Sequence, residues 1–183
     1  MGASTIPLRN GAPVAGALDG ITRDLVVVDE PHNEIHEGDN YRYCDPTTLA
    51  SGVSQDYLIT TPNTAKWAHF TFHADGSDIT SVFLYEGSDK TGTTAQTVFN
   101  SNRNSTNTAG VTVLKGTSGG TTDGTLLCSY SSGVKEKLGA STDHNSEWVL
   151  KQNTKYLLRI TSGAVGNKCN INLSWYEHTN ERE

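Results

Sequence analysis

The sequence lacks a basic run, a paired set of cysteines and a long apolar stretch. Its 14 basic residues are scattered and its formal net charge is −6, so the basic stripe of a nucleic-acid groove is missing. Three cysteines without a CxxC pair argue against a disulfide framework or a zinc ribbon, and they suit a thiol-reducing compartment such as the cytoplasm. No apolar run is long enough to cross a membrane, and the first 13 residues lack the charged and apolar blocks of a secretory signal.

Apolar and charged residues are also scarce, at 34% and 19% of the chain. Threonine, serine, asparagine and 18 glycines take their place. Threonine favours strands, while glycine, asparagine and serine favour turns. No stretch of helical length keeps an apolar stripe with i, i+3, i+4 spacing. The composition therefore predicts an all-β protein with many loops.

Strand signals occur through the chain after residue 24. In "WAHFTFHAD" (67–75), alanine and phenylalanine alternate with more polar residues, as they do in a strand with one buried face. "CNINLSWYEH" (169–178) alternates in the same way. We expect two hairpins, one joining 67–75 to 79–87 through Asp75-Gly76, the other joining 147–151 to 155–161. Further strands are expected at 24–29, 110–116 and 124–130.

Roughly ten short strands in one mid-sized domain predict an antiparallel two-sheet β-sandwich of jelly-roll-like type. The domain is expected to span residues 25–183 and to carry long polar loops at 87–110, 115–124 and 131–147. Residues 1–24 are rich in glycine and small residues and lack periodicity. They predict an extended N-terminal arm, with a disordered terminus as the alternative.

The segment "EPHNEIHEGD" (30–39) contains two histidines and several carboxylates, which raises the question of a metal site. The glutamate is misplaced for an HExxH motif, and Pro31 and Gly38 argue against a useful helix. In a strand, His32 and His36 would lie about 13 Å apart, too far to share one ion. We therefore interpret the segment as a polar strand face, and predict no metal, cofactor or catalytic residue. A cupin-like metalloenzyme using these two histidines is retained as an alternative.

Two other groups of residues are candidates for binding. Trp67, His69 and His73 share the polar side of the strand at 67–75, which predicts a surface patch rather than an active site. In "NSNRNSTNT" (100–108), asparagine and serine side chains are expected to form Asx-type turns. Arg103 is a forked donor that can hold this loop or meet the carboxylate of a neighbouring subunit.

The segments "DEPHNEIHEGDNY", "LYEGSDKTGT", "NSNRNSTNT" and "WVLKQNTKYLLRIT…INLSWYEH" together resemble a family of small virion structural proteins of tailed bacteriophages, of the head-decoration or capsid-cement type. The resemblance covers about residues 26–178. It implies an all-β capsid accessory protein without enzymatic activity. Such a protein is made in the host cytoplasm and lies on the outer capsid surface, where it bridges neighbouring capsomers. The implied partner is the major capsid protein, with no nucleic acid or membrane involved.

A homotrimer suits the symmetry of a shell, and repeated weak contacts there give strong avidity. The arm, which lies outside the resemblance, is expected to lace onto the shell. The candidate capsid contacts are Ile6, Pro7, Leu8, Arg9 and Arg103. A carbohydrate-binding jelly roll of a tail or host-recognition structure is the alternative, with Trp67, Tyr41 or Tyr43 as sugar platforms.

Overall fold

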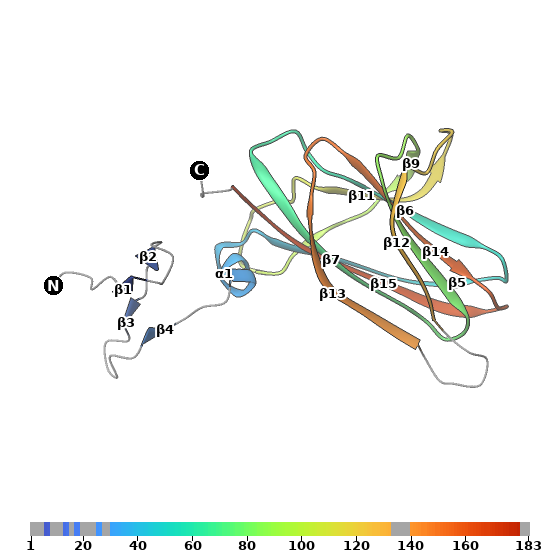
Figure 1. Cartoon of the computed structure of the whole chain (residues 1–183), viewed down its shortest axis with the longest axis horizontal. Coiled ribbons are helices and arrows are strands. Elements are labelled where there is room, and N and C mark those ends of the chain that lie inside the picture. Colours follow the sequence, from blue (N-terminus) through green and yellow to red (C-terminus); the bar gives the residue numbers. More distant parts are fainter. Residues whose placement is uncertain are drawn as a thin grey trace. The chain divides into compact units, whose positions relative to one another are not determined.

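The computed structural model describes residues 30–132 and 140–179, together with four two-residue strands in the first 26 residues (Figure 1). Contacts divide the chain into two units, Met1–Asn33 and Glu34–Glu183. In the first unit, β1 (Ile6–Pro7) pairs with β2 (Pro13–Val14), and β3 (Ala17–Leu18) pairs with β4 (Leu25–Val26). The elements that follow are α1 (Glu30–Glu37), β5 (Asn40–Leu49), β6 (Ser54–Thr60), β7 (Lys66–Gly76), β8 (Thr80–Glu86), β9 (Thr91–Ala95), β10 (Phe99–Asn100), β11 (Thr112–Ser118), β12 (Thr125–Ser132), β13 (Ala140–Leu150), β14 (Lys155–Ser162) and β15 (Asn167–Thr179).

Two antiparallel sheets form the body of the second unit. The five-stranded sheet has the order β10-β5-β15-β7-β13, and the six-stranded sheet has the order β12-β8-β14-β6-β11-β9. The two sheets pack face to face around a single cluster of buried residues from both (Figure 1). The predicted all-β, two-sheet antiparallel sandwich is therefore confirmed.

The strand pairing has the nested order of a jelly roll. β5 pairs with β15, β6 with β14, β7 with β13 and β8 with β12, so the two halves of the chain pair from the outside inward. Members of successive pairs alternate between the two sheets. This arrangement places strands that are far apart in sequence side by side, which is how two Greek keys build a double sheet. β9, β10 and β11 are inserted between the innermost pair.

Both predicted hairpins are wrong. β7 lies in the five-stranded sheet and β8 in the six-stranded sheet, so Asp75 and Gly76 precede a crossover between sheets. β13 and β14 are divided in the same way. The crossover after β7 is held by Asn167 at the start of β15, whose side chain accepts a hydrogen bond from Asp78 N at 2.9 Å and donates one to Ile79 O at 3.0 Å.

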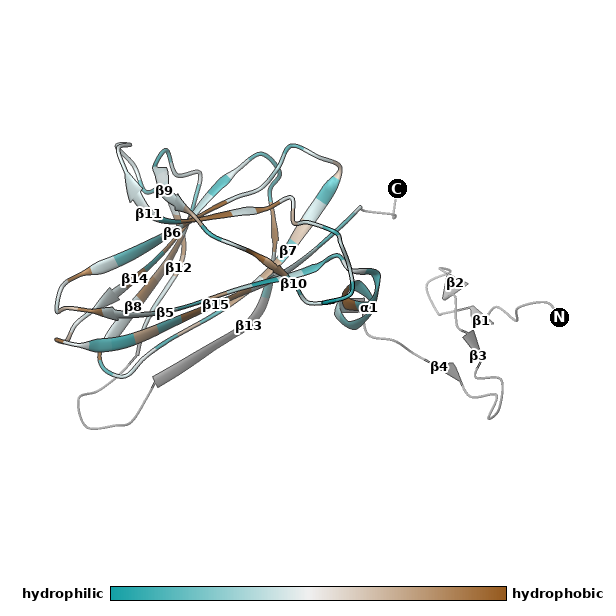
Figure 2. Cartoon of the chain, turned by 180° about the vertical axis from the view of Figure 1, so that it is seen from behind, coloured by the Kyte–Doolittle hydropathy of each residue, from teal (hydrophilic) through white to brown (hydrophobic). Residues whose placement is uncertain are grey.

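The predicted faces of the strongest strands are confirmed. In β7, Ala68, Phe70, Phe72 and Ala74 are buried while the alternate residues are not. In β15, one face is buried over Ile171, Leu173 and Trp175. The alternation of hydrophobic and hydrophilic residues along the strands is visible in Figure 2. Burial of these side chains, at about 25 cal/mol per Å² of apolar area removed from water, is the main force that holds the sheets together.

The segment at 30–39 is mostly a helix, so its interpretation as a strand face is wrong. Pro31 stands near the start of α1 (Glu30–Glu37), where its missing N–H costs nothing because no intrahelical partner would be available. Gly38 ends the helix with a φ of +84°, and Asp39 N donates to Glu34 O at 2.9 Å. This is the left-handed cap that glycine supplies at low cost. The proline and glycine that argued against a helix are its boundaries.

Other sequence predictions change in extent. The predicted loop at 87–110 contains β9 and β10, and the one at 131–147 contains the first part of β13, which begins at Ala140. The strand expected at 24–29 is represented by β4, Leu25–Val26, and its other residues lie outside the described part. The arm predicted over residues 1–24 stays a prediction.

Candidate functional site

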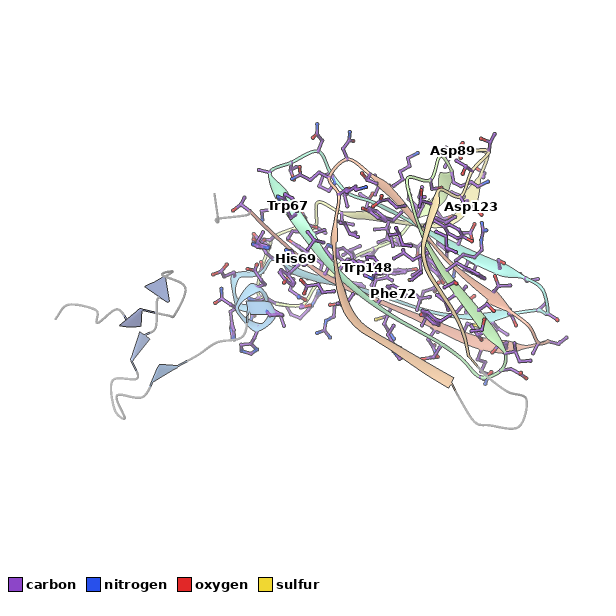
Figure 3. The ribbon with its side chains drawn as sticks, in the orientation of Figure 1. Trp67, His69, Phe72, Asp89, Asp123 and Trp148 are labelled. Carbon is purple, nitrogen blue, oxygen red and sulfur yellow. The ribbon has the colours of Figure 1, made fainter. Side chains whose placement is uncertain are left out.

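A cluster of aromatic and histidine side chains lies on the outer face of the five-stranded sheet. In the register of β7 and β15, His69 stands opposite Tyr176 and Trp67 opposite His178. The His69 and Tyr176 rings stack with centroids 4.6 Å apart, and the His69 and His178 rings are also 4.6 Å apart. Figure 3 shows Trp67 and His69 together along β7, near the end of the sandwich that faces α1. We define the aromatic–histidine patch as Trp67, His69, Glu147, Tyr176 and His178.

Glu147 of β13 orders this patch. Its carboxylate bonds His69 Nδ1 and accepts hydrogen bonds from Tyr176 OH at 3.1 and 3.2 Å. The register of β13 against β7 shifts between His144 and Trp148. Glu147 therefore lies within an irregularity of the ladder, the kind of feature that re-aims a side chain. Three strands thus contribute to one connected set of contacts.

The contacts determine where the ring protons lie when both imidazoles are neutral. A carboxylate only accepts, so Nδ1 of His69 carries the hydrogen that is shared with Glu147. His69 Nε2 is then an acceptor, and it lies 2.8 Å from His178 Nε2, which must be the donor. The His69 and Tyr176 rings are held both by stacking and by a directional bond, and the His178 ring by its bond to His69. These three rings form a prearranged part of the patch with few side-chain rotamers left to restrict.

The predicted surface group of Trp67, His69 and His73 shares Trp67 and His69 with this patch. Trp67 is 41% exposed, and it shares the outer face with His69. His73 lies four residues after His69 on the same face and contacts Asp75, with 3.3 Å between Nε2 and Oδ2. Sequence reasoning missed Glu147, which pairs with His69 across 78 residues. It also missed the partnership with Tyr176 and His178, because only strand register reveals it.

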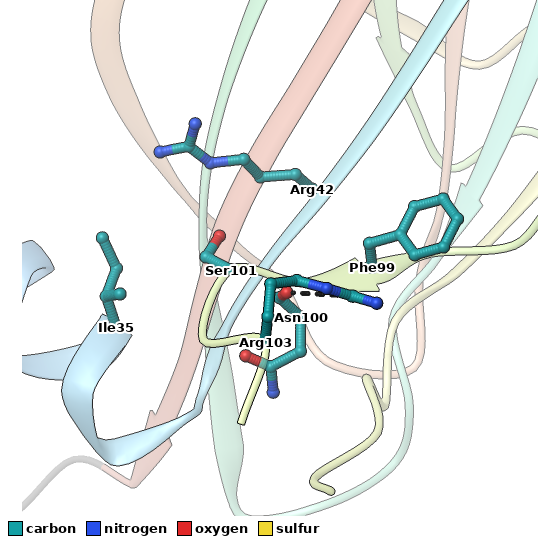
Figure 4. Close-up of a pocket in the computed structure, with 6 residues that line it drawn as sticks. All are labelled: Ile35, Arg42, Phe99, Asn100, Ser101 and Arg103. Carbon is teal, nitrogen blue, oxygen red and sulfur yellow. Dashed lines mark hydrogen bonds between the residues drawn. The ribbon is translucent and has the colours of Figure 1, made fainter. Parts of the chain in front are cut away.

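A second candidate is a pocket of about 350 Å³ beside β10, at the edge of the same sheet. We call it the arginine pocket. Figure 4 shows Arg42 projecting from β5, Phe99 from β10 and Arg103 from the loop after β10. None of the described residues that line it is acidic. Its lining consists of Ile35, Arg42, Phe99, Asn100, Ser101 and Arg103.

The local role predicted for Arg103 is confirmed. Its Nη1 donates to Asn100 O at 3.4 Å, and its guanidinium lies 5.4 Å from the centroid of the Phe99 ring. The expected Asx-type turns are present as well. Asn102 N donates to Asn100 Oδ1 at 2.8 Å, and Asn104 N donates to Asn102 Oδ1 at 3.1 Å. The loop thus holds Arg103 in place without a carboxylate.

The side chains of the predicted arm contacts lie outside the part of the chain that the structure describes. Ile6 and Pro7 form β1, which pairs with β2. Leu8 and Arg9 lie outside the described residues. Their proposed contact with a capsid stays a prediction.

His32 and His36 are both exposed on α1. In the part of the chain that the structure describes, no group of three or more histidine, cysteine, aspartate or glutamate side chains could hold a metal ion. The three cysteines are free thiols. Cys169 is buried and Cys128 half-buried, and burial raises the pKa of both thiols, as expected for thiols that pack as small hydrophobic groups. No helix in the described ranges is long and apolar enough to cross a bilayer.

A charged network on the six-stranded sheet has a structural role. Arg159 of β14 binds Asp56 through Nε and Nη2, at 2.7 and 2.9 Å, and Asp123 through Nη1 at 2.6 Å. These two carboxylates raise the pKa of the guanidinium. Asp89 accepts hydrogen bonds from Thr121 N and Thr122 N, which lower the pKa of its carboxyl group. Asp89 and Asp123 lie at the end of the sandwich away from Trp67 (Figure 3). The network holds the loop between β11 and β12.

Comparisons with protein-family models, curated proteins and solved structures found no match to this chain.

Proposed function

We propose that this chain is a non-enzymatic structural protein of a tailed-bacteriophage virion that decorates and stabilises the assembled capsid by bridging neighbouring capsomers. Its partners are the major capsid protein and further copies of itself, arranged as a trimer on the outer capsid surface. The sequence segments that resemble capsid-decoration proteins support the proposal. A jelly-roll body supports it too, because this fold occurs among viral capsid proteins as well as lectins and cupins.

The observation that carries an adhesive role is the prearranged aromatic–histidine patch. Stacking and hydrogen bonds restrain Tyr176, His69 and His178 in advance. A surface that is already ordered loses little side-chain entropy on binding, so more of its contact energy appears as affinity. Many copies on one shell multiply that affinity through avidity.

Removal of residues 1–24 is expected to reduce capsid occupancy about tenfold or more. Each subunit would attach through its sandwich alone, and it would lose the avidity that a second attachment through the arm provides. The measurement is the number of bound copies per shell after the variant is added to capsids stripped of the native protein. The variant's thermal unfolding should match that of the full chain, which controls for damage to the sandwich. Full occupancy by the truncated protein would refute the role of the arm.

The exposed indole of Trp67 favours carbohydrate binding as a second candidate function. Aromatic rings on a rigid sheet face give apolar surface with a polar rim, which suits the faces of sugar rings. On a glycan array, Trp67→Ala is then expected to abolish binding by the purified protein. Trp148→Ala is unsuitable as the matched control because Trp148 packs against the core. Val149→Ala, at an exposed position opposite His69, removes apolar surface without removing a ring. No glycan binding by the unaltered protein would exclude this candidate.

A further inference from the structure

Two guanidinium groups in the arginine pocket have no carboxylate partner within the described residues. The Arg42 side chain is exposed and makes no hydrogen bond or ion pair there, and the Arg103 guanidinium bonds only Asn100 O. Five of the seven other basic side chains in the described part pair with carboxylates, whereas Lys155 donates to Lys90 O and Lys168 is exposed. Those that pair with carboxylates are Lys66, Lys90, Lys115, Lys151 and Arg159. In a chain with a net charge of −6, two unpaired arginines beside one pocket indicate a site for an anionic group.

The pocket also has an apolar wall. Phe99 is 54% exposed and lines the pocket together with Ile35. The Arg103 guanidinium already lies over the Phe99 ring. A matching ligand therefore needs a carboxylate for the arginine forks and an apolar group next to it. Arginine binds carboxylates in a bidentate, directional manner. The two arginines therefore favour a planar carboxylate over an anion that offers only a point charge.

The edge of β5 next to the pocket is open. β10 pairs only with Tyr41 and Arg42, and no other described strand pairs with β5 on that side. Asn40 O accepts a hydrogen bond from Ser101 N, so the even-numbered residues of β5 direct their backbone groups to this edge. The open edge therefore presents the N–H and C=O of Cys44 and the carbonyl of Pro46. Pro46 lacks an N–H at that position, as is typical of an edge strand.

We propose that an extended, acidic segment of the shell protein docks here. Its backbone adds to the open edge of β5 at Cys44, and an aspartate or glutamate side chain lies between Arg42 and Arg103. An apolar neighbour of that carboxylate packs on Phe99 and Ile35. The mode is strand addition, in which backbone bonds give affinity and side-chain pockets give specificity. The inference rests on the proposed function for the source of the segment, while the chemistry of the site is independent of it.

A peptide is a better match than an acidic sugar. An extended peptide supplies both a carboxylate and the alternating donors and acceptors that a strand edge requires. A sugar ring would need an open aromatic face, and one face of Phe99 is already covered by the Arg103 guanidinium. Glucuronate nevertheless provides the comparison that separates the two ligands.

The first test is an NMR titration of the full chain with acetyl-Thr-Val-Asp-Val-Thr-amide. Chemical-shift changes are expected at the Arg42 and Arg103 side-chain N–H groups and at the Cys44 amide. The peptide with asparagine in place of aspartate should bind with an affinity at least about fivefold lower, since a neutral amide does not make charge-assisted pairs. The double variant Arg42→Gln/Arg103→Gln should remove the difference between the two peptides.

Lys168→Gln is the matched control. Lys168 is an exposed basic residue on the same sheet, and it lies six positions along β15 from Ser174, the residue opposite Arg42, a span of about 20 Å. This variant should bind the acidic peptide as the unaltered chain does. Equal binding of both peptides, shifts confined to other surfaces, or glucuronate binding at lower concentration than the acidic peptide would each overturn the inference.

The second test uses capsids stripped of the native protein. If the acidic segment belongs to the shell, Arg42→Gln/Arg103→Gln should raise the concentration needed for half-occupancy at least about tenfold, and Lys168→Gln should not. Unchanged occupancy by the double variant would overturn the pocket as the shell contact and leave the proposed function intact. If the native protein does not bind shells while the peptide selectivity holds, the proposed function is wrong and the carboxylate site stands.

Discussion

Replacing Glu177 by alanine is expected to lower the free energy of unfolding by about 3–5 kcal/mol, because each buried donor left without a partner costs about 1–3 kcal/mol. Glu177 is 4% exposed, and its carboxylate accepts hydrogen bonds from three N–H groups. Gly110 N donates to both oxygens, at 3.0 and 2.9 Å, and Val111 N donates to Oε1 at 3.0 Å. Trp175 Nε1 donates at 2.9 Å. The side chain thus joins β15, the buried indole and the segment before β11.

Urea unfolding of the two proteins measures this effect, with equal m-values as the condition for comparison. Glu177→Gln provides the control, because its carbonyl oxygen still accepts from Val111 and Trp175 while its amide faces a donor. Its loss should be about half that of the alanine variant, given the weaker bonds of a neutral acceptor. A loss below about 1 kcal/mol for Glu177→Ala, the size of an ordinary surface substitution, would contradict this role.

The faces of the strands were predictable, whereas their assignment to sheets was not. Alternation in β7 and β15 shows which residues are buried, because one side of each strand meets the core. The two sheets share that core, so an apolar face looks the same in either one. Asp75-Gly76 is a good local turn signal, yet the chain crosses between sheets there. Local turn chemistry carries no information on the nested pairing of strands that are far apart in the sequence.

The short helix α1 was missed for a related reason. Periodicity identifies a helix through its apolar stripe, and α1 has only Ile35 as an aliphatic residue apart from Pro31. Its boundaries carried the usable signal. A proline near the first position and a glycine just after the last one are the typical asymmetry of a helix. Weighing those two residues as caps, rather than as breakers, would have predicted it.

The candidate surfaces show what sequence can and cannot provide about a site. Trp67 and His69 were predictable because they share one strand, and Arg103 because its contacts are local. Glu147 was not, since it reaches His69 from another strand through an irregular stretch of β13. The importance of Arg42 depends on what is absent around it, a property of the folded surface.

The two candidate surfaces belong to one face of one sheet. Arg42 of β5 stands opposite Ser174 of β15, and Tyr176, two residues further on, belongs to the aromatic–histidine patch. On a strand, residues two apart project from the same side. A partner that contacts the arginine pocket therefore reaches the patch within the width of a few strands. One broad contact would use a rigid aromatic part for packing and an arginine part for specificity, consistent with the division of roles seen at protein interfaces.

Replacing Asn167 by alanine is expected to cost about 2–3 kcal/mol of unfolding free energy, because its amide satisfies backbone groups at the crossover after β7 and unpaired buried groups cost about 1–3 kcal/mol each. Asn167 is 1% exposed. Its Oδ1 accepts from Asp78 N at 2.9 Å, and its Nδ2 donates to Ile79 O at 3.0 Å and to Thr80 Oγ1 at 2.9 Å. Chemical unfolding at neutral pH measures the loss.

Asn167→Asp keeps the acceptor oxygen of this side chain but removes its amide hydrogens. The new group can donate a hydrogen bond only when its carboxyl group is protonated, so pH separates the two roles. The new carboxyl group would be buried beside the Ile79 carbonyl and near Asp78, so its folded-state pKa would lie above the unfolded value of about 3.9. Relative to the native chain, the variant should then be more stable at pH 4 than at pH 7, and it should lose about 1.4 kcal/mol for each pH unit by which the pKa is raised. The same change at exposed Asn172 should give little pH dependence. Equal penalties for Asn167→Asp at pH 4 and pH 7 would mean that the amide hydrogens do not hold the crossover.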